Sequence, residues 1–223
     1  MCNLYSKLIM PSTLRAFFED MGVDLTETSL TKNYEPGYVG ADSDGPVIRW
    51  TGNNSKLEIA DLRWGFPPAP IKNAKRKPKP ITNIRNLESR WWKDVNREYL
   101  TQKSYRCLVP FDRFSEWDAS QKKNAWFKAK SDVSFFAGIW RPWTGERLKD
   151  VGEKRRKRTE DSWELYSFLT TEANSIVKPI HPKAMPVILT ESADCKAWLN
   201  GDEATSLQRP LPDEMLERVT ESN

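Results

Sequence analysis

The sequence is poor in the residues that build disulfide frameworks and zinc sites. It has three cysteines and one histidine among 223 residues. Cys2, Cys107 and Cys195 are odd in number and show no metal-ligand spacing, which excludes a disulfide framework and favours a reducing compartment. His181 is the single histidine. So few thiol and imidazole groups argue against a zinc site, and we expect no metal and no other cofactor.

Long apolar runs are also absent. No stretch reaches the roughly 20 apolar residues that a membrane-spanning helix needs, and the first residues lack the charged-then-apolar pattern of a secretory signal. Hydrophobic residues make up 38% of the chain and charged residues 30%, while ten tryptophans and nine phenylalanines supply large buried areas. We therefore expect a folded cytoplasmic protein that makes no contact with a membrane.

The basic residues are concentrated in two short runs. The net charge of +4 is too small by itself to indicate a polyanionic partner. However, the segment KNAKRKPK covers residues 72–79, and EKRRKR covers residues 153–158. Either run alone is typical of a solvated loop, but two in one chain favour a polyanion such as nucleic acid.

Strand-like segments outnumber helical ones. A helix is predicted at 11–21, capped by Ser12 or Thr13, and the polar, highly charged run 144–162 is predicted as an excursion loop. The remaining pattern predicts a β-hairpin at 47–66, helices at 87–100 and 192–199, and strands at 81–86, 105–117, 124–130, 134–140, 164–174 and 186–189. Because the strands follow one another directly, we expect a single α+β domain over residues 1–223. It would have a mostly antiparallel β-sheet, flanking helices, a core at about 2–200 and a short C-terminal tail.

The first residues, MCNLYS, place a cysteine directly after the initiator methionine. Many N-termini are frayed and have no role, and that explanation stays open. The chemical alternative is that removal of Met1 leaves Cys2 with a free amine and a free thiol on adjacent carbons. Such a 1,2-aminothiol condenses with an aldehyde and closes a five-membered thiazolidine ring. At their ordinary pKa values of about 7.7–8.0 and 8.5, useful fractions of both groups are nucleophilic near neutral pH.

Three polar positions in apolar surroundings are further candidates for chemistry, because burial of a polar group is unfavourable unless it has a partner. Glu116 lies in RFSEW against Trp117, where an aromatic wall would raise the carboxyl pKa and suit an acid–base role; the alternative is an exposed glutamate at a strand end. His181 lies in the proline-stiffened segment KPIHPKAMPVIL, and histidine readily gains and loses a proton near neutral pH, although a lone histidine is often structural.

The third position is ITNIRN, where Asn83 and Arg85 would share one face of an extended segment. An amide and a guanidinium two residues apart form a donor-rich surface for a phosphate or a carbonyl oxygen, and the alternative is an ordinary polar sheet face. Cys107 and Cys195 alternate with apolar neighbours and are predicted to lie in the core.

Taken together, the motifs resemble those of one family. The set MCNLYS, YEPGY, LRWGF, TNIRN, RCLVPFDRFSEW, FAGIW, LTTEAN and IHPKAMPVIL is similar to the SOS response-associated peptidase family, the abasic-site processing proteins. The resemblance runs from Cys2 to about Leu189 in the family's order. It implies binding of single-stranded DNA and a covalent link to abasic sites through the N-terminal cysteine, in the DNA damage response. It also implies a location at damaged DNA in the nucleoid.

The resemblance assigns a role to each matching residue. Cys2 would be the nucleophile that traps the open-chain aldehyde. Asn83 would hold the ring or the cysteine backbone, and Glu116 would shuttle protons during imine formation and ring closure. His181 would help to open the deoxyribose ring or to reverse the link. Family members are credited with removing their own N-terminal segment, but here that segment is only Met1, which an ordinary aminopeptidase can remove.

DNA contacts are implied less uniformly. Arg85 would pair with a phosphate near the lesion, and Trp64 in the RWGF turn would stack on a base or be a core residue. The sequence departs from the family where Leu4 replaces an arginine that contacts DNA. The HPKAMP segment is also one residue longer than the family's HDRMP, so that Lys183 stands in for a second arginine.

Two other functions remain compatible with the sequence. One is an N-terminal-nucleophile cysteine hydrolase that acts on a peptide or amide, since Cys2 with Asn83, Glu116 and His181 would also suit acyl transfer. The other is a non-catalytic module that binds single strands through basic loops and aromatic side chains. We expect a monomer by default. Replacement of Cys2 would abolish the covalent link in the leading case, abolish hydrolysis in the second, and have no effect in the third.

Overall fold

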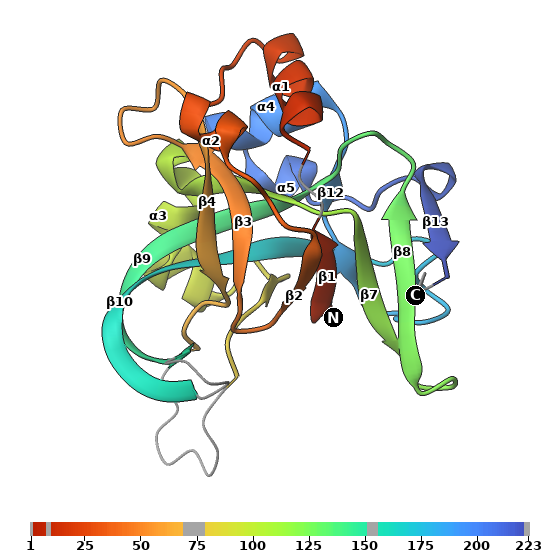
Figure 1. Ribbon diagram of the computed structural model, residues 1–223. Coiled ribbons are helices and arrows are strands. Elements are labelled where there is room, and N and C mark those ends of the chain that lie inside the picture. Colours follow the sequence, from red (N-terminus) through yellow and green to blue (C-terminus); the bar gives the residue numbers. More distant parts are fainter. Residues whose placement is uncertain (1, 8–9, 69–78, 151–155, 221–223) are drawn as a thin grey trace.

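The larger of two β-sheets closes on itself to form a small barrel (Figure 1). A computed structural model describes residues 2–7, 10–68, 79–150 and 156–220. The order of the strands in this sheet is β11 (Met185–Pro186), β10 (Arg156–Thr171), β4 (Leu57–Trp64), β3 (Asp44–Trp50), β6 (Arg106–Pro110), β9 (Phe135–Asp150) and β12 (Ile188–Leu189). β9 also pairs with β10, which closes the ring, and β5 (Asn83–Ile84) pairs with β10.

The smaller sheet carries the N-terminal strand. Its order is β13 (Leu216–Val219), β8 (Lys123–Ala129), β7 (Arg113–Asp118), β1 (Leu4–Lys7) and β2 (Gly37–Gly40). All its pairs are antiparallel, whereas in the larger sheet β10 runs parallel to β4 and β5. The predicted α+β domain with a mostly antiparallel sheet is therefore confirmed.

Short helices cover the sheets (Figure 1). They are α1 (Pro11–Asp20), α2 (Glu27–Thr31), α3 (Arg97–Thr101), α4 (Ser192–Asn200) and α5 (Ala204–Leu207), with a π-helical turn at Trp91–Val95 and 3₁₀ turns at Lys103–Tyr105 and Asp213–Met215. The helix predicted at 11–21 is confirmed, but Ser12 and Thr13 do not cap it. The cap residue is Met10, which makes no side-chain cap bond, and Pro11 occupies the first helical position, where its missing N–H is not needed.

The helix predicted at 87–100 is interrupted at Asn96. This fully buried side chain donates a hydrogen bond from Nδ2 to the Trp91 carbonyl oxygen (2.9 Å) and accepts one at Oδ1 from Arg141 Nη1 (2.8 Å). The side chain thus competes with the regular helical ladder, and the segment divides into the π-helical turn and α3.

The excursion loop predicted at 144–162 is wrong for the described residues. Within this run, 144–150 belong to β9 and 156–162 to β10, in continuous antiparallel register with Trp143 opposite Trp163. One charged residue of this run is buried, because Arg147 is only 6% exposed. It donates hydrogen bonds from Nη1 to Asp42 Oδ1 (3.0 Å) and from Nη2 to the Gly65 carbonyl oxygen (2.6 Å). These bonds attach the long hairpin to the body of the barrel.

Parts of both basic runs lie outside the described residues, namely 72–78 and 154–155. Lys79, Lys157 and Arg158 are described and exposed. The segment expected as a C-terminal tail also has structure, because β13 pairs with β8, and Leu207, Leu211 and Leu216 are buried.

Candidate active site

The first residues of the chain are placed by strand pairing. β1 lies beside β7 (Figure 1). Leu4 is opposite Ser115 in this antiparallel pair, so Cys2 and Asn3 lie near Glu116, whose charge acts on the Cys2 thiol. β5 supplies Asn83, and the loop before β11 supplies His181. Four segments that are distant in sequence therefore meet at the start of β1.

Cys2 is fully buried at this meeting point. Its carbonyl oxygen accepts a hydrogen bond from Asn83 Nδ2 (2.9 Å), and its Sγ donates a weak bond to the Leu4 carbonyl oxygen (3.5 Å). Burial raises the pKa of the Cys2 thiol far above its ordinary value, and the negative charge of Glu116 raises it further. The thiol is therefore neutral at physiological pH, and any reaction at Sγ needs a neighbouring proton acceptor.

Asn83 is oriented by residues beneath it. Its Nδ2 also donates to Thr82 Oγ1 (2.8 Å), and the Thr82 carbonyl oxygen accepts from Trp64 Nε1 (3.1 Å). Its Oδ1 is buried and has no hydrogen-bond partner among the described residues. Trp64, Thr82, Asn83 and Cys2 thus form a continuous chain of contacts, which we call the Asn83 support chain.

Glu116 is 2% exposed and lies on the inner face of β7. Burial raises the pKa of its carboxyl group, and the positive charges of the N-terminal ammonium and of His181 oppose this effect. The expected direction of the shift is confirmed, but Trp117 is not its cause. Neighbouring residues in a strand point to opposite faces, and Trp117 is 56% exposed on the outer face.

His181 is held by its own loop. Its backbone N–H donates to the Val177 carbonyl oxygen (2.9 Å). Its Nδ1 lies 2.8 Å from the carbonyl oxygen of Ala184 and 3.2 Å from the amide nitrogen of the same residue. A protonated Nδ1 can donate to the carbonyl oxygen, and an unprotonated Nδ1 can accept from the amide N–H. The ring is therefore fixed at Nδ1, and its charge acts on the Glu116 carboxyl group.

The expected DNA contacts have different outcomes. Arg85 and Lys183 are both exposed, and they lie together, because Arg85 Nη1 donates to the carbonyl oxygens of Thr171 (3.0 Å) and Lys183.

Trp64 cannot stack on a base in this structure, so that prediction is wrong. It has no exposed surface, and its ring packs on Phe168 with centroids 5.2 Å apart. The core alternative that the sequence left open for Trp64 is confirmed, as it is for Cys107 and Cys195.

Sequence reasoning missed two features near the site, the orientation of Trp117 and the contact made by Thr82. Trp117 was treated as a hydrophobic wall, although strict strand alternation would have placed it outside once Glu116 was placed inside. Thr82 gave no signal, because its contact with Asn83 is a local side-chain bond that no periodicity predicts.

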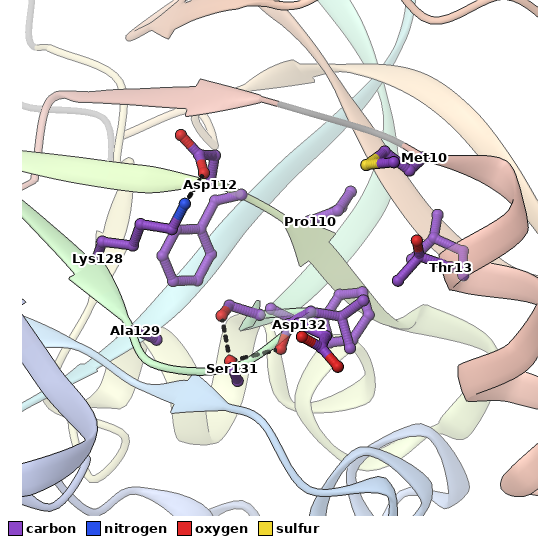
Figure 2. Close-up of a pocket in the computed structure, with 13 residues that line it drawn as sticks. Met10, Thr13, Pro110, Asp112, Lys128, Ala129, Ser131 and Asp132 are labelled. Atoms are coloured by element: carbon purple, nitrogen blue, oxygen red, sulfur yellow. Dashed lines mark hydrogen bonds and ion pairs between the residues drawn. The ribbon is translucent and has the colours of Figure 1, made fainter. Parts of the chain in front are cut away.

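A separate pocket of about 300 Å³ lies beside the start of α1 (Figure 2). None of the candidate site residues is among the described residues that line it. Four of its polar side chains are paired within the pocket: Lys128 Nζ is 2.7 Å from Asp112 Oδ1, and Ser131 Oγ is hydrogen-bonded to Ser134 Oγ at 2.8 Å (Figure 2). The pocket is distinct from the Cys2 site and offers no obvious chemistry.

The described part of the chain contains no group of three or more histidine, cysteine or acidic side chains arranged to hold a metal ion. Within the same part, no helix has the length and apolar character needed to cross a bilayer.

Comparison with known proteins decides the family. Residues 1–222 match the sequence profile of the SOS response associated peptidase (SRAP) family. The chain belongs to the SRAP family. This SRAP member is 32% identical over 196 residues to the abasic site processing protein YoaM of Bacillus subtilis, covering 84% of this chain and 77% of the relative. It is 33% identical over 173 residues to YoqW of Bacillus subtilis, also named an abasic site processing protein, covering 75% and 68%.

Two crystal structures share the fold of this SRAP member. A Bordetella bronchiseptica protein has a TM-score of 0.67 at 21% identity, over 98% of this chain and all of the other. A Bacteroides thetaiotaomicron protein has a TM-score of 0.67 at 23% identity, over 99% and 93%.

Proposed function

We propose that this SRAP member processes abasic sites in single-stranded DNA by forming a covalent thiazolidine link through Cys2 after removal of Met1. The observation that carries the proposal is the convergence of a buried thiol, an amide, a buried carboxyl and a histidine at residue 2. The names of the two Bacillus subtilis relatives, both abasic site processing proteins, support the substrate class. The protein would act as a monomer in the cytoplasm, at damaged DNA in the nucleoid.

The reaction balances without an oxidant or a reductant. The amine of Cys2 adds to the C1′ aldehyde of the open-chain abasic sugar, and loss of one water molecule gives an imine. The thiol then adds across the C=N bond, which forms an S–C1′ bond and leaves the thiol proton on nitrogen after transfer. The product is the thiazolidine plus one water molecule.

The raised pKa values determine what the neighbours have to do. A carboxyl group with a raised pKa holds a proton more readily than an ordinary carboxyl group and would donate that proton to the departing hydroxyl group. The resulting carboxylate can then accept the proton of the Cys2 thiol, which needs such help because its own pKa is raised by burial. Glu116 therefore suits both proton transfers, and His181 would donate to the ring oxygen of the closed sugar as it opens.

Asn83 would provide orientation rather than acid–base chemistry. Its Nδ2 fixes the Cys2 carbonyl and hence the backbone from which amine and thiol project. Its buried Oδ1 would accept a hydrogen bond from the amine or from the ring N–H of the product. Arg85 and Lys183 lie side by side on the surface and would pair with phosphates next to the lesion.

The hydrolase alternative is less well supported by the same geometry. Acyl transfer by cysteine uses a thiolate, and reactive cysteines have lowered pKa values. Burial raises the pKa of the Cys2 thiol, which disfavours a thiolate as the first nucleophile. In the proposed link the amine reacts first, and Glu116 would take the thiol proton afterwards.

The test is a denaturing gel of protein, with Met1 removal confirmed by mass, mixed with an abasic oligonucleotide. With single strands we expect a shifted band whose mass is that of protein plus DNA minus one water molecule. Borohydride should add no hydrogen to it, because no imine remains to be reduced. Cys2→Ala should abolish it, and Cys195→Ala, a matched change of a buried thiol elsewhere, should not. A missing band, or an equal band with Cys2→Ala, would refute the proposal. Shortened DNA in the same lanes would report strand cleavage by β-elimination.

A further inference from the structure

A second pocket, of about 600 Å³, lies between the π-helical turn with α3 and the turn that joins α4 to α5. Its apolar wall is formed by the buried residues Leu87, Trp92, Leu100 and Ala204. None of the candidate site residues is among the described residues that line it. Its volume and its apolar wall are typical of a site for a small organic ligand. We call it the Arg106 pocket, after the arginine at its floor.

Arg106 lines this pocket although it is only 1% exposed. Its Nη2 donates hydrogen bonds to the carbonyl oxygens of Leu100 and Asp202, the second at 3.2 Å. Its Nε and Nη1 are buried and have no hydrogen-bond partner among the described residues. The guanidinium carbon lies 3.7 Å from the ring centroid of Trp198. This ring covers a face of the guanidinium, whereas the N–H groups lie in its plane, so the stacking leaves them without an acceptor.

The charge of Arg106 is also poorly compensated. Burial lowers the pKa of Arg106 to about 10, although the negative charges of Glu203 and Asp202 act in the opposite direction. The guanidinium therefore keeps its charge at neutral pH. Because a buried cation without a paired anion is unfavourable, an anion in the pocket would supply both the missing charge and the missing acceptors.

The rim of the pocket restricts the kind of anion. Six charged side chains line the pocket besides Arg106, namely Glu88, Asp94, Asp202, Glu203, Lys93 and Arg97. With four acids and two bases, the rim repels a dianion such as phosphate, whereas a monoanion matches the single buried cation. A carboxylate accepts charge-assisted hydrogen bonds from a guanidinium, and an apolar body attached to it would pack against the wall that contains Trp92.

The turn at residues 201–203 controls access to the floor. Because Nε and Nη1 are buried, a ligand oxygen reaches them only when this turn shifts outward. Asp202 and Glu203 are exposed, and the Asp202 carbonyl oxygen contacts Arg106 through one long hydrogen bond. Gly201 has a φ of 86°, which lets the chain turn sharply at the end of α4.

We propose that the Arg106 pocket binds a small organic monocarboxylate, with the carboxylate paired to Arg106 and the apolar body against Leu87, Trp92 and Leu100. Binding would move the turn at 201–203 and would give the unpartnered N–H groups of Arg106 an acceptor. The site is separate from Cys2, and this inference does not rest on the proposed function.

The test is an NMR titration of the full-length, nitrogen-labelled protein with phenylacetate. We expect the amide signals of Gly201 and Thr205, which line the pocket, to shift with a Kd of about 1–10 mM. Phenethyl alcohol, which has the ring but no charge, should bind at least about 10-fold more weakly, because it lacks a charge-assisted hydrogen bond. Inorganic phosphate, which has charge but no apolar body, should leave these signals unchanged.

Two variants test the role of charge. Asp202→Asn removes a negative charge near Arg106 and should tighten phenylacetate binding about 2- to 5-fold, the effect of one charge at short range in water. Glu217→Gln is the matched control, since Glu217 is an exposed acid in β13 of the smaller sheet. Arg106→Met keeps the volume and removes the cation, and it should weaken binding at least about 10-fold. If Arg106→Met does not fold, Asp202→Asn, a change at an exposed side chain, still decides.

Three outcomes would overturn the inference. The first is that phenylacetate leaves the Gly201 and Thr205 signals unchanged at concentrations well above the expected Kd. The second is equal binding of phenylacetate and phenethyl alcohol, which would show an apolar pocket without carboxylate recognition. The third is that Asp202→Asn binds phenylacetate no more tightly than Glu217→Gln does.

Discussion

The Asn83 support chain predicts that a residue that does not touch the substrate controls the rate of crosslinking. Thr82 is 8% exposed, and its Oγ1 accepts one of the two N–H groups of Asn83, while the Cys2 carbonyl oxygen accepts from the same nitrogen. Thr82→Val replaces the hydroxyl with a methyl group of similar size. The amide then loses the bond that fixes its rotation, although packing is retained.

The magnitude follows from the single bond removed. A net contribution of about 0.5–1.5 kcal/mol per hydrogen bond lowers the population of the competent Asn83 orientation, and hence the rate, about 2- to 12-fold. Leaving the donor unsatisfied costs about 1–3 kcal/mol of stability, or a decrease in Tm of roughly 2–12 °C in a chain of this size.

The assay is the single-turnover rate of crosslinking at saturating protein, together with binding of intact single-stranded DNA. A positioning role predicts a slower rate with unchanged affinity, and Thr82→Ser, which keeps Oγ1, should react almost normally. Trp64→Phe should show a smaller loss of the same kind, because it removes the donor to the Thr82 carbonyl oxygen. The reasoning is refuted if Thr82→Val reacts at the normal rate while Asn83→Ala is slow, or if Thr82→Ser is as slow as Thr82→Val.

Four other substitutions probe the site and the residues that support it. Glu116→Gln should abolish most crosslinking yet raise Tm by a few degrees at pH 8. Burial raises the pKa of the Glu116 carboxyl group, so its ionisation destabilises the fold at pH values above the carboxyl pKa of the unfolded chain. The gain in Tm from Glu116→Gln should therefore disappear below about pH 4. Thermal melts over a range of pH would contradict this if the gain persisted there. Arg85→Gln and Lys183→Gln should each reduce the slope of log affinity against log salt by about 0.7, and an unchanged slope would exclude a phosphate contact. Asp42→Asn should destabilise the protein by up to about 3–5 kcal/mol in urea, since it leaves the buried Arg147 and Arg63 without this carboxylate. A value near zero would show that the fold does not depend on these ion pairs.

The sequence was most informative where one physical signal determines structure. Alternation and turn residues predicted the hairpin formed by β3 and β4, and the apolar face of α1 placed Leu14 and Phe18 in the core. The family match from motif order is confirmed by the profile over residues 1–222. The roles of Cys2, Asn83, Glu116 and His181 stay predictions, although the structure brings the four residues together.

The errors arose where polar residues are buried or aromatic residues are exposed. Arg147 reads as surface charge, but its partners Asp42 and the Gly65 carbonyl oxygen come from elsewhere in the chain, so only the fold reveals a strand there. Trp64 and Trp117 are both tryptophans next to motif residues, and composition cannot tell which one is outside. Strand register gives opposite answers for them: Trp64 faces the core and Trp117 faces solvent.

Under the proposed function, the burial of Cys2 would keep its reaction selective. An exposed thiolate beside a free amine would react with any small aldehyde or oxidant, since exposure and thiolate character govern cysteine reactivity. Here burial raises the pKa of the thiol and leaves it no exposed surface, so in the proposed reaction it would react only when an amine-bound imine lies within reach and a base removes its proton. The proposed reaction would then have a set order: the amine reacts first, and the thiol closes the ring only on an aldehyde that the protein has already positioned. Exposure of Cys2 by a looser N-terminal segment should therefore increase reaction with free aldehydes and reduce the preference for DNA, which competition with a small aldehyde would measure.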